Sequence, residues 1–206
     1  MFNMCFMNYA ANQFRKDPKE ELILATEQVL ATGGIDAATV RTITGVAGLN
    51  GSAVNYHFGS RDDLFAVICS RRMQPANQDI LAELDRLENS ADPICIEDVF
   101  RPLVETAFSV WVNDDVLRTL RSLIFVNPVS ANKLNNSQMG DVYGRMCELL
   151  MGTCQQLSPA QVRKRFQLAL AVLMNTIHNY DADRSWARED VTVDELVDFI
   201  SAGFRG

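Results

Sequence analysis

The chain has 206 residues, of which 48% are apolar and 22% are charged, and its formal net charge is −7. This balance is typical of an ordinary globular protein with one large domain or two small ones. No run of roughly 18 uncharged apolar residues occurs, which argues against a membrane-spanning helix. The mildly apolar stretch before Phe14 lacks a basic start and a clean cleavage site, so it does not resemble a signal peptide and we expect a cytoplasmic protein.

The acidic charge is concentrated in the C-terminal two thirds of the chain. Residues 1–72 contain seven Lys or Arg and seven Asp or Glu, whereas residues 73–206 contain twelve basic and nineteen acidic residues. Within the neutral part, no acidic residue occurs between Ala37 and Arg61. Carboxylates repel phosphates at close range, so this acid-free stretch favours a surface that lies against nucleic acid.

The sequence predicts helices throughout, and it contains no convincing strand. The first helix, Lys19–Thr32, has apolar residues at the 3.6-residue spacing of an amphipathic helix. Asp17 is its predicted N-cap and Pro18 its first-turn proline. Gly33 and Gly34 are expected to end it, because glycine readily adopts the left-handed conformation of a helix terminus.

Two short helices are predicted next, joined by a tight turn at Gly48-Leu49-Asn50. Thr39 caps the first of them, and Asn50 caps the second, which spans Gly51–Phe58. Their predicted inward residues are Val40, Ile43, Val46 or Ala47, Val54 and Phe58. Two short helices that cross at a steep angle over a glycine turn form a helix-turn-helix, whose second helix enters the major groove of DNA.

The rest of the chain is predicted to be helical as well. A fourth helix begins at Ser60 and runs past Met73, and prolines occur along the rest of the chain at 75, 93, 102, 128 and 159. Later helices are predicted at about 76–89, 97–112, 115–126, 141–156, 159–180 and 192–204. The polar stretches 127–140 and 181–190 are predicted loops.

The segment from Glu21 to Cys69 resembles the N-terminal domain of the TetR family of bacterial regulators. The matching residues are Gly33 or Gly34, Thr39, Ile43, Ala47-Gly48, Asn50, Tyr56-His57-Phe58 and Gly59-Ser60-Arg61-Asp62-Asp63-Leu64. The resemblance implies an all-α fold: a three-helix helix-turn-helix domain, followed by a larger helical domain for ligand binding and dimerisation. We place a flexible arm at residues 1–16, the DNA-binding domain at 17–66 and the C-terminal domain at 67–206.

The resemblance also implies roles for individual side chains. Thr39 caps the second helix and binds a phosphate, Tyr56 and His57 match phosphate-contacting positions, and Arg61 matches a basic residue that contacts the DNA backbone. Base reading is expected from Arg41, Ser52 and Asn55, with a thymine methyl contact from Ala53. The full predicted DNA-binding set is Thr39, Arg41, Thr42, Asn50, Gly51, Ser52, Ala53, Asn55, Tyr56, His57 and Arg61.

The expected partners are double-stranded operator DNA, a second copy of the chain and an unknown small-molecule effector, with no membrane. The segments 142–156 and 160–180 are the predicted dimerisation helices, because the second carries a wide apolar stripe. Residues expected to line a ligand pocket, each also a candidate for plain core, are Phe108, Trp111, Leu120, Leu123, Ile124, Met146, Leu150, Met174 and His178.

The sequence predicts no metal, no cofactor and no enzymatic activity. The five cysteines are scattered and form no CxxC pair, and the two histidines are far apart. No nucleophile–base pattern or glycine-rich phosphate loop is found. The alternative is a TetR-like helical module that has lost DNA binding and binds lipid or acts as a scaffold. The acidic total and the weak base-reading residues Gly51 and Ala53 favour that alternative, while Thr39, Tyr56, His57 and Arg61 argue against it.

Overall fold

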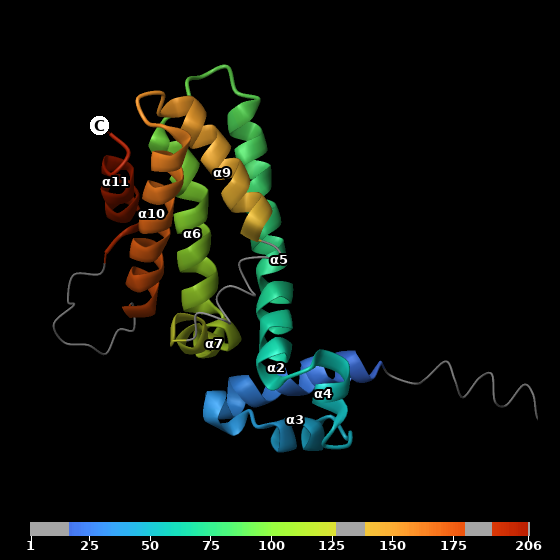
Figure 1. The fold of residues 1–206 in the computed structure, drawn as a ribbon. Coiled ribbons are helices and arrows are strands. Elements are labelled where there is room, and N and C mark those ends of the chain that lie inside the picture. Colours follow the sequence, from blue (N-terminus) through green and yellow to red (C-terminus); the bar gives the residue numbers. More distant parts are fainter. Residues whose placement is uncertain (1–16, 127–138, 180–190, 206) are drawn as a thin grey trace, which may run out of the picture. The chain divides into compact units, whose positions relative to one another are not determined.

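A computed structural model describes residues 17–126, 139–179 and 191–205, and these residues form helices without any strand. The predicted all-α fold is therefore confirmed. The chain divides into two compact units, residues 1–68 and 69–206, which are considered separately below. The division falls within helix α5 (Arg61–Glu88), after Ile68, whereas the sequence prediction places the boundary after Ala66. Figure 1 shows the helices of both units.

The described part of the first unit begins with helix α2 (Pro18–Ala37). The Asp17 side chain accepts a hydrogen bond of 3.0 Å from the backbone N–H of Lys19, which confirms the predicted N-cap. The helix extends beyond the predicted end at Thr32, but it is interrupted at Gly34, where φ is 70° and ψ is −169°. The predicted break thus exists at the glycine pair, since few other residues adopt this backbone conformation, and a further helical turn follows it.

Two short helices, α3 (Val40–Val46) and α4 (Ala53–Phe58), and the start of α5 follow in the described part of the first unit. Both pack against α2 and against each other. Their shared core consists of Leu22, Ile23, Val29, Leu30, Ile43, Val54 and Leu64. Of the two alternatives for the last inward residue of α3, Val46 is wrong because 48% of it is exposed; Ala47 is half-buried.

Helix α5 continues past Pro75, so the prediction of two separate helices here is wrong. A proline inside a helix removes one backbone hydrogen bond and costs about 3 kcal/mol. Within the second unit, Met73, Ile80 and Leu84 form a buried stripe at helical spacing that runs through the proline. Burial of these apolar side chains on both sides of the proline offsets the local cost, and Pro75 itself is exposed.

The second unit is built around helix α6 (Ile96–Asn113). Helices α7 (Asp115–Val126), α9 (Met139–Thr153), α10 (Pro159–Asn179) and α11 (Val193–Ala202) all contact it. Phe100, near the start of α6, is buried between two other rings, with centroid distances of 5.9 Å to Phe166 and 5.2 Å to Phe204. These aromatic contacts join α10 and the residues after α11 to the central helix.

An ion-pair cluster links α9 to the second-unit part of α5. The Arg145 guanidinium lies 2.5 Å from carboxylate oxygens of both Asp85 and Glu88. Its hydrogen bond holds the pKa of Glu88 below the ordinary value for a glutamate. No helix in the described ranges is both long enough and apolar enough to span a membrane.

Candidate nucleic-acid interface

The turn between α3 and α4 is set by Gly48. Its φ of 66° lies in the left-handed region, and Leu49 donates its backbone N–H to the Thr44 carbonyl at 2.9 Å. This geometry ends α3 sharply and directs the chain into α4. Because α3 and α4 contact each other across so short a connection, the pair forms a helix-turn-helix.

Two threonine hydroxyls stand at the exposed start of α3. Thr39 has an extended backbone, and its Oγ1 accepts a hydrogen bond of 3.1 Å from the backbone N–H of Thr42, which confirms the predicted cap. The two hydroxyl oxygens are 2.8 Å apart. Arg41, between them, is exposed and makes no ion pair with any residue that the structure describes. A hydroxyl pair beside an uncompensated guanidinium is well suited to bind an anion.

Asn50 has a different local role from the predicted one. It accepts hydrogen bonds from both the backbone N–H (3.1 Å) and the hydroxyl (2.7 Å) of Ser52. Regular helix begins only at Ala53, with Ser52 at the N-cap position, so Asn50 stabilises the turn rather than capping a helix from Gly51. The Ser52 hydroxyl proton is engaged by Asn50, which leaves the oxygen lone pairs of Ser52 as acceptors.

Helix α4 presents polar and aromatic side chains to solvent. Asn55 is exposed, and Tyr56, at 84%, is the most exposed large hydrophobic side chain among the described residues. The half-buried His57 ring meets the Tyr56 ring edge-on, at a centroid distance of 4.8 Å and an angle of 86°. Ala53 is only 7% exposed, because its methyl group packs into the unit, and little of it remains for a base.

Arg61, the first residue of α5, is held by its own helix. Its guanidinium lies 5.2 Å from the centre of the Phe65 ring, and its Nε is 3.7 Å from an Asp62 oxygen. The Ser60 hydroxyl accepts a hydrogen bond from the Asp63 N–H at 3.0 Å and donates one to the Asp63 carboxylate. These contacts fix the start of α5 and orient a half-buried arginine beside the end of α4.

The predicted DNA-binding residues therefore differ in accessibility, although all belong to the first unit. Those exposed are Thr39, Arg41, Thr42, Asn50, Gly51, Ser52, Asn55 and Tyr56; His57 and Arg61 are half-buried, and Ala53 is buried. No carboxylate lies between Ala37 and Arg61, so the surface formed by these residues carries only neutral and cationic groups. The structure adds one feature that the sequence did not indicate, the Asn50–Ser52 hydrogen-bond pair.

The predicted ligand-pocket residues lie in the second unit, and their role stays a prediction. Trp111, Leu120, Met146 and Leu150 are buried, and Phe108, Met174 and His178 are half-buried; the side chains of Leu123 and Ile124 lie outside the described part of the chain. Asn77 of α5, which was not predicted, is 5% exposed, and neither its amide nitrogen nor its amide oxygen has a hydrogen-bond partner among the described residues.

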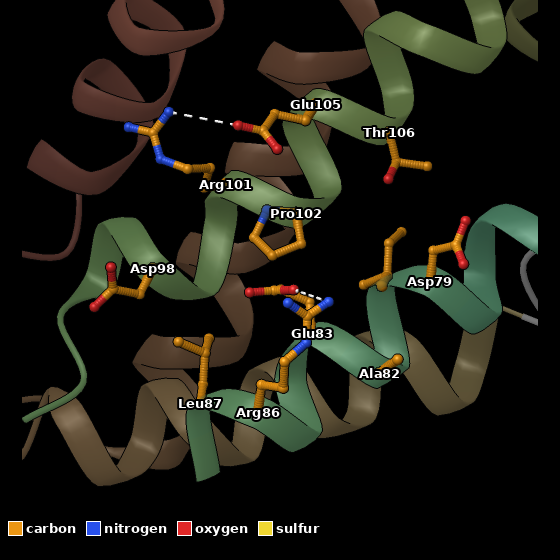
Figure 2. Close-up of a pocket in the computed structure, with 11 residues that line it drawn as sticks. Asp79, Ala82, Glu83, Arg86, Leu87, Asp98, Arg101, Pro102, Glu105 and Thr106 are labelled. Atoms are coloured by element: carbon orange, nitrogen blue, oxygen red, sulfur yellow. Dashed lines mark ion pairs between the residues drawn. The ribbon is translucent and has the colours of Figure 1, made fainter. Parts of the chain in front are cut away.

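A groove of about 330 Å³ lies between α5 and α6, and it contains none of the predicted ligand residues. Figure 2 shows that charged side chains line it, including the Arg86–Glu83 pair at 2.6 Å. Arg101 pairs with Asp194 at 2.7 Å and with Glu105 at 3.7 Å, so the cations of the groove are already neutralised. Within the ranges that the structure covers, no three His, Cys, Asp or Glu side chains gather to hold a metal ion.

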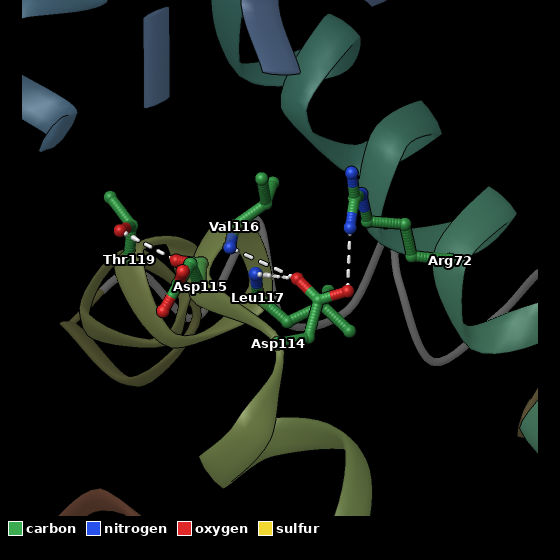
Figure 3. Close-up of polar contacts among 6 residues, drawn as sticks. All are labelled: Arg72, Asp114, Asp115, Val116, Leu117 and Thr119. Carbon is green, nitrogen blue, oxygen red and sulfur yellow. Dashed lines mark hydrogen bonds and ion pairs between the residues drawn. The ribbon is translucent and has the colours of Figure 1, made fainter. Parts of the chain in front are cut away.

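Arg72 and Asp114 connect α5 to the α6–α7 junction within the second unit. Arg72 Nη1 lies 2.5 Å from an Asp114 oxygen. The other Asp114 oxygen accepts hydrogen bonds from the backbone N–H groups of Val116 (3.0 Å) and Leu117 (2.9 Å), as Figure 3 shows. Through Asp114, Arg72 therefore helps to order the start of α7.

Comparison with known proteins agrees with this geometry. Residues 22–68 match the model of the bacterial regulatory proteins of the tetR family. No curated protein sequence matches the chain. The first unit is thus a TetR-type helix-turn-helix domain, and it belongs to the TetR family as the sequence predicts.

Three solved structures illustrate the likeness over the whole chain. The fatty acid degradation regulator FadR of Bacillus halodurans is 20% identical with a TM-score of 0.63, covering 89% of this chain and 98% of its own. The multidrug binding protein EbrR, complexed with imidazole, is 13% identical at a TM-score of 0.58, covering 91% and 95%. A transcriptional regulator of Aquifex aeolicus VF5 is 16% identical at 0.50, covering 92% and 98%. At these identities the likeness shows the fold of such regulators.

Proposed function

We propose that the chain is a transcriptional regulator that binds operator DNA through α3 and α4. The observation that carries this proposal is the acid-free, exposed surface of the helix-turn-helix, with the hydroxyls of Thr39, Thr42 and Tyr56 and the guanidinium of Arg41. Hydroxyl and guanidinium groups bind phosphate oxygens and fix the register of a protein on the duplex. An acidic protein that binds DNA needs such a local exception to its net charge of −7.

Within this surface we assign different roles to different side chains. Thr39, Tyr56 and Arg61 contact the phosphate backbone, in keeping with their hydroxyl and cationic groups. Arg41 and Asn55 read base edges, because a guanidinium pairs well with guanine and an amide with adenine. Ser52 contributes an acceptor only, and the burial of Ala53 argues against a large thymine contact from its methyl group.

We further propose that the protein is a repressor that a small molecule releases from DNA. The support is the larger helical unit, in which the buried Asn77 amide has no partner among the described residues, and the relationship in fold to FadR and to the multidrug binding protein EbrR. A dimer would place two recognition helices about 34–36 Å apart on the operator. A ligand can shift the equilibrium between the DNA-binding conformation and the released conformation by no more than the difference between its binding free energies for the two.

A footprint on the DNA upstream of the gene, repeated over a range of salt concentrations, tests the proposal. We expect protection of two half-sites one helical turn apart and an affinity that falls with salt. The Tyr56→Ala, Arg61→Ala double variant should weaken binding to all DNA sequences and flatten the salt dependence, because it removes two phosphate contacts. Unchanged binding by this folded variant would overturn the assigned docking surface.

The same experiment separates the alternative, a helical module that has lost DNA binding. The absence of a side chain at Gly51 and the burial of Ala53 favour it, because they reduce the number of base contacts from α4. Such a module would give no footprint and no retention on heparin at low salt. Specific protection would exclude it.

A further inference from the structure

An amide side chain is buried inside the second unit without a hydrogen bond. Asn77 of α5 is 5% exposed, and neither its Nδ2 nor its Oδ1 has a hydrogen-bond partner among the described residues. Its neighbours on the same face of α5 are apolar, because Met73, one turn before it, and Ile80, one turn after it, are both buried. An amide in such surroundings costs free energy, since it gives up its hydrogen bonds to water and gains none from the protein.

Asn77 lies opposite the C-terminal half of α6. Arg72 of α5 contacts Asp114, just after the end of α6, at 2.5 Å. Further along, residues of α5 between 79 and 87 share a groove with residues of α6 between 98 and 106. The two helices therefore run in opposite directions, as Figure 2 shows for the groove.

The helical rise gives the level of Asn77 along α6. Each residue advances a helix by about 1.5 Å, so Asn77 lies about 7.5 Å along α5 from the level of Arg72. Counted back from Asp114, Trp111 lies about 4.5 Å and Phe108 about 9 Å along α6 in the same direction. Asn77 is therefore level with the turn of α6 between Phe108 and Trp111, two of the residues that the sequence predicts for a ligand pocket.

The α6 side of this region is apolar as well. Ile80, which shares the buried face of Asn77, lines the groove between α5 and α6, so this face is turned towards α6. On α6, Ala107 and Trp111 are buried and Phe108 is half-buried. A polar group held among apolar and aromatic side chains is the usual composition of a site for a small molecule.

We propose that Asn77 binds the polar group of the effector and selects a neutral molecule with an N–H and a C=O on one edge, as in a primary amide or a lactam. This inference rests on the proposed function in that it names the chemical class of the small molecule that the second unit binds. An asparagine side chain has both a donor, Nδ2, and an acceptor, Oδ1. The edge of a second amide matches it with two parallel hydrogen bonds, which satisfy both groups.

Ions of either sign fit Asn77 less well. A carboxylate only accepts hydrogen bonds, so it pairs with Nδ2 and leaves Oδ1 facing another acceptor. An ammonium group only donates and leaves Nδ2 unpaired, and either ion loses its hydration among the apolar side chains. Arg121, a buried cation of the same unit, donates to the Ile177 carbonyl at 2.7 Å, so its guanidinium is engaged with the end of α10.

Isothermal titration calorimetry of the full-length chain, without DNA, tests this selectivity. The probes are the straight-chain primary amides from hexanamide to dodecanamide, each with the methyl ester and the carboxylate of the same acyl chain. We expect an amide of this series to bind at least about tenfold more tightly than its ester and its carboxylate, because only the amide satisfies both groups of Asn77. Amides that do not bind, or that bind no more tightly than their esters, would overturn the inference.

Asn77→Leu keeps the branched shape of the side chain and removes its polar atoms. This variant should bind amide and ester equally, and its unfolding equilibrium constant in urea should be at least about fivefold lower than that of the wild type, because the unpaired amide is gone. Gln78→Leu is the matched control, since Gln78 is the next residue of α5 and is exposed. It should keep the stability and the amide preference of the wild type.

Two results with these variants would contradict the role of Asn77. An Asn77→Leu protein that is less stable than the wild type would show that the amide is already satisfied within the folded chain. An Asn77→Leu protein that still prefers the amide over the ester would place the selecting group elsewhere. Either result would overturn the inference.

These measurements separate the inference from the proposed function because none of them involves DNA. A DNA footprint together with unselective binding of the probes would overturn the role of Asn77 alone. Amide binding without a footprint would overturn the DNA-binding proposal and leave the Asn77 site intact. Amide binding that leaves the affinity for the operator unchanged would overturn only the proposed release from DNA.

Discussion

The first unit carries its distinctive residues on the surface, whereas the second unit holds most of its large side chains inside. Tyr56 of the first unit is 84% exposed, while Phe100 is 1% exposed between two other rings of the second unit. The family model matches residues 22–68 only. A surface that contacts a constant partner, the DNA backbone, constrains residue types, whereas an interior accepts many combinations of apolar side chains of suitable volume.

The charges differ in the same way. Residues 1–72 are neutral overall and residues 73–206 carry the whole net charge of −7. In the second unit the cations Arg72, Arg101 and Arg145 are paired with carboxylates. In the first unit Arg41 has no such partner among the described residues. These three arginines thus stabilise the second unit itself, whereas Arg41 of the first unit remains available to a ligand.

Replacement of one aromatic residue in each unit should give opposite results. Phe100→Ala should lower the free energy of unfolding by about 3–5 kcal/mol, because it leaves a cavity in a packed core. Tyr56→Ala should change it by less than about 0.5 kcal/mol, because the ring is mostly in solvent, yet it should weaken DNA binding. Urea unfolding and a gel-shift titration of both variants measure the two effects. A large loss of stability in Tyr56→Ala would contradict the division between surface and interior.

Removal of one cation from each unit tests whether DNA binding depends on the local charge of α3 or on the net charge of the protein. Arg41→Ala should cost about 1–3 kcal/mol of operator binding and relax specificity at one base pair, because it removes a direct base contact. Arg86→Ala makes the same charge change at an exposed site of the second unit. It should leave DNA binding within about twofold. Equal losses in both variants would show that α3 has no special role.

The Arg72–Asp114 pair is expected to have a smaller effect, confined to the second unit. Asp114→Ala removes an acceptor for Arg72 and for two N–H groups of α7, so it should lower the free energy of unfolding by about 1–2 kcal/mol. Asp115→Ala breaks only the surface pair with Arg118 and should cost less than about 0.5 kcal/mol. Thermal unfolding of the two variants side by side would show no difference if Asp114 were simply solvated.

Features determined by neighbouring residues were predictable from the sequence. The caps at Asp17 and Thr39 and the turn at Gly48 depend on side chains that act within a few residues, and the structure confirms all three. The predicted helices from 97 onward also agree with α6, α7, α10 and α11 to within about two residues where they are described, which is the usual uncertainty of helix ends.

Features that depend on packing were not predictable in this way. The continuity of α5 through Pro75 depends on what covers its buried stripe, and the orientation of Ala53 depends on the position of α2. The Arg145 pair with Glu88 joins residues 57 positions apart, which a single sequence does not reveal.

Cysteine labelling gives the finest test of how far the interior of the second unit extends. Cys69 is the first residue of that unit, and burial raises its pKa from 9.0 to about 12, with Asp114 acting in the same direction. Cys95 is exposed, although partial desolvation also raises its pKa. A raised pKa means less thiolate at a given pH, and at pH 8 only about one Cys69 in ten thousand would be ionised.

Iodoacetamide at pH 8 should therefore modify Cys95 at least about 100-fold faster than Cys69, with both rates rising as the pH increases. Peptide mass spectrometry over a time course distinguishes the two sites, and urea-unfolded protein, in which both should react alike, is the control. Equal rates in the folded protein would mean that the second unit opens readily at its first residue. In that case the second unit would be closed to solvent only at residues further along the chain from Ile68, where the two units divide.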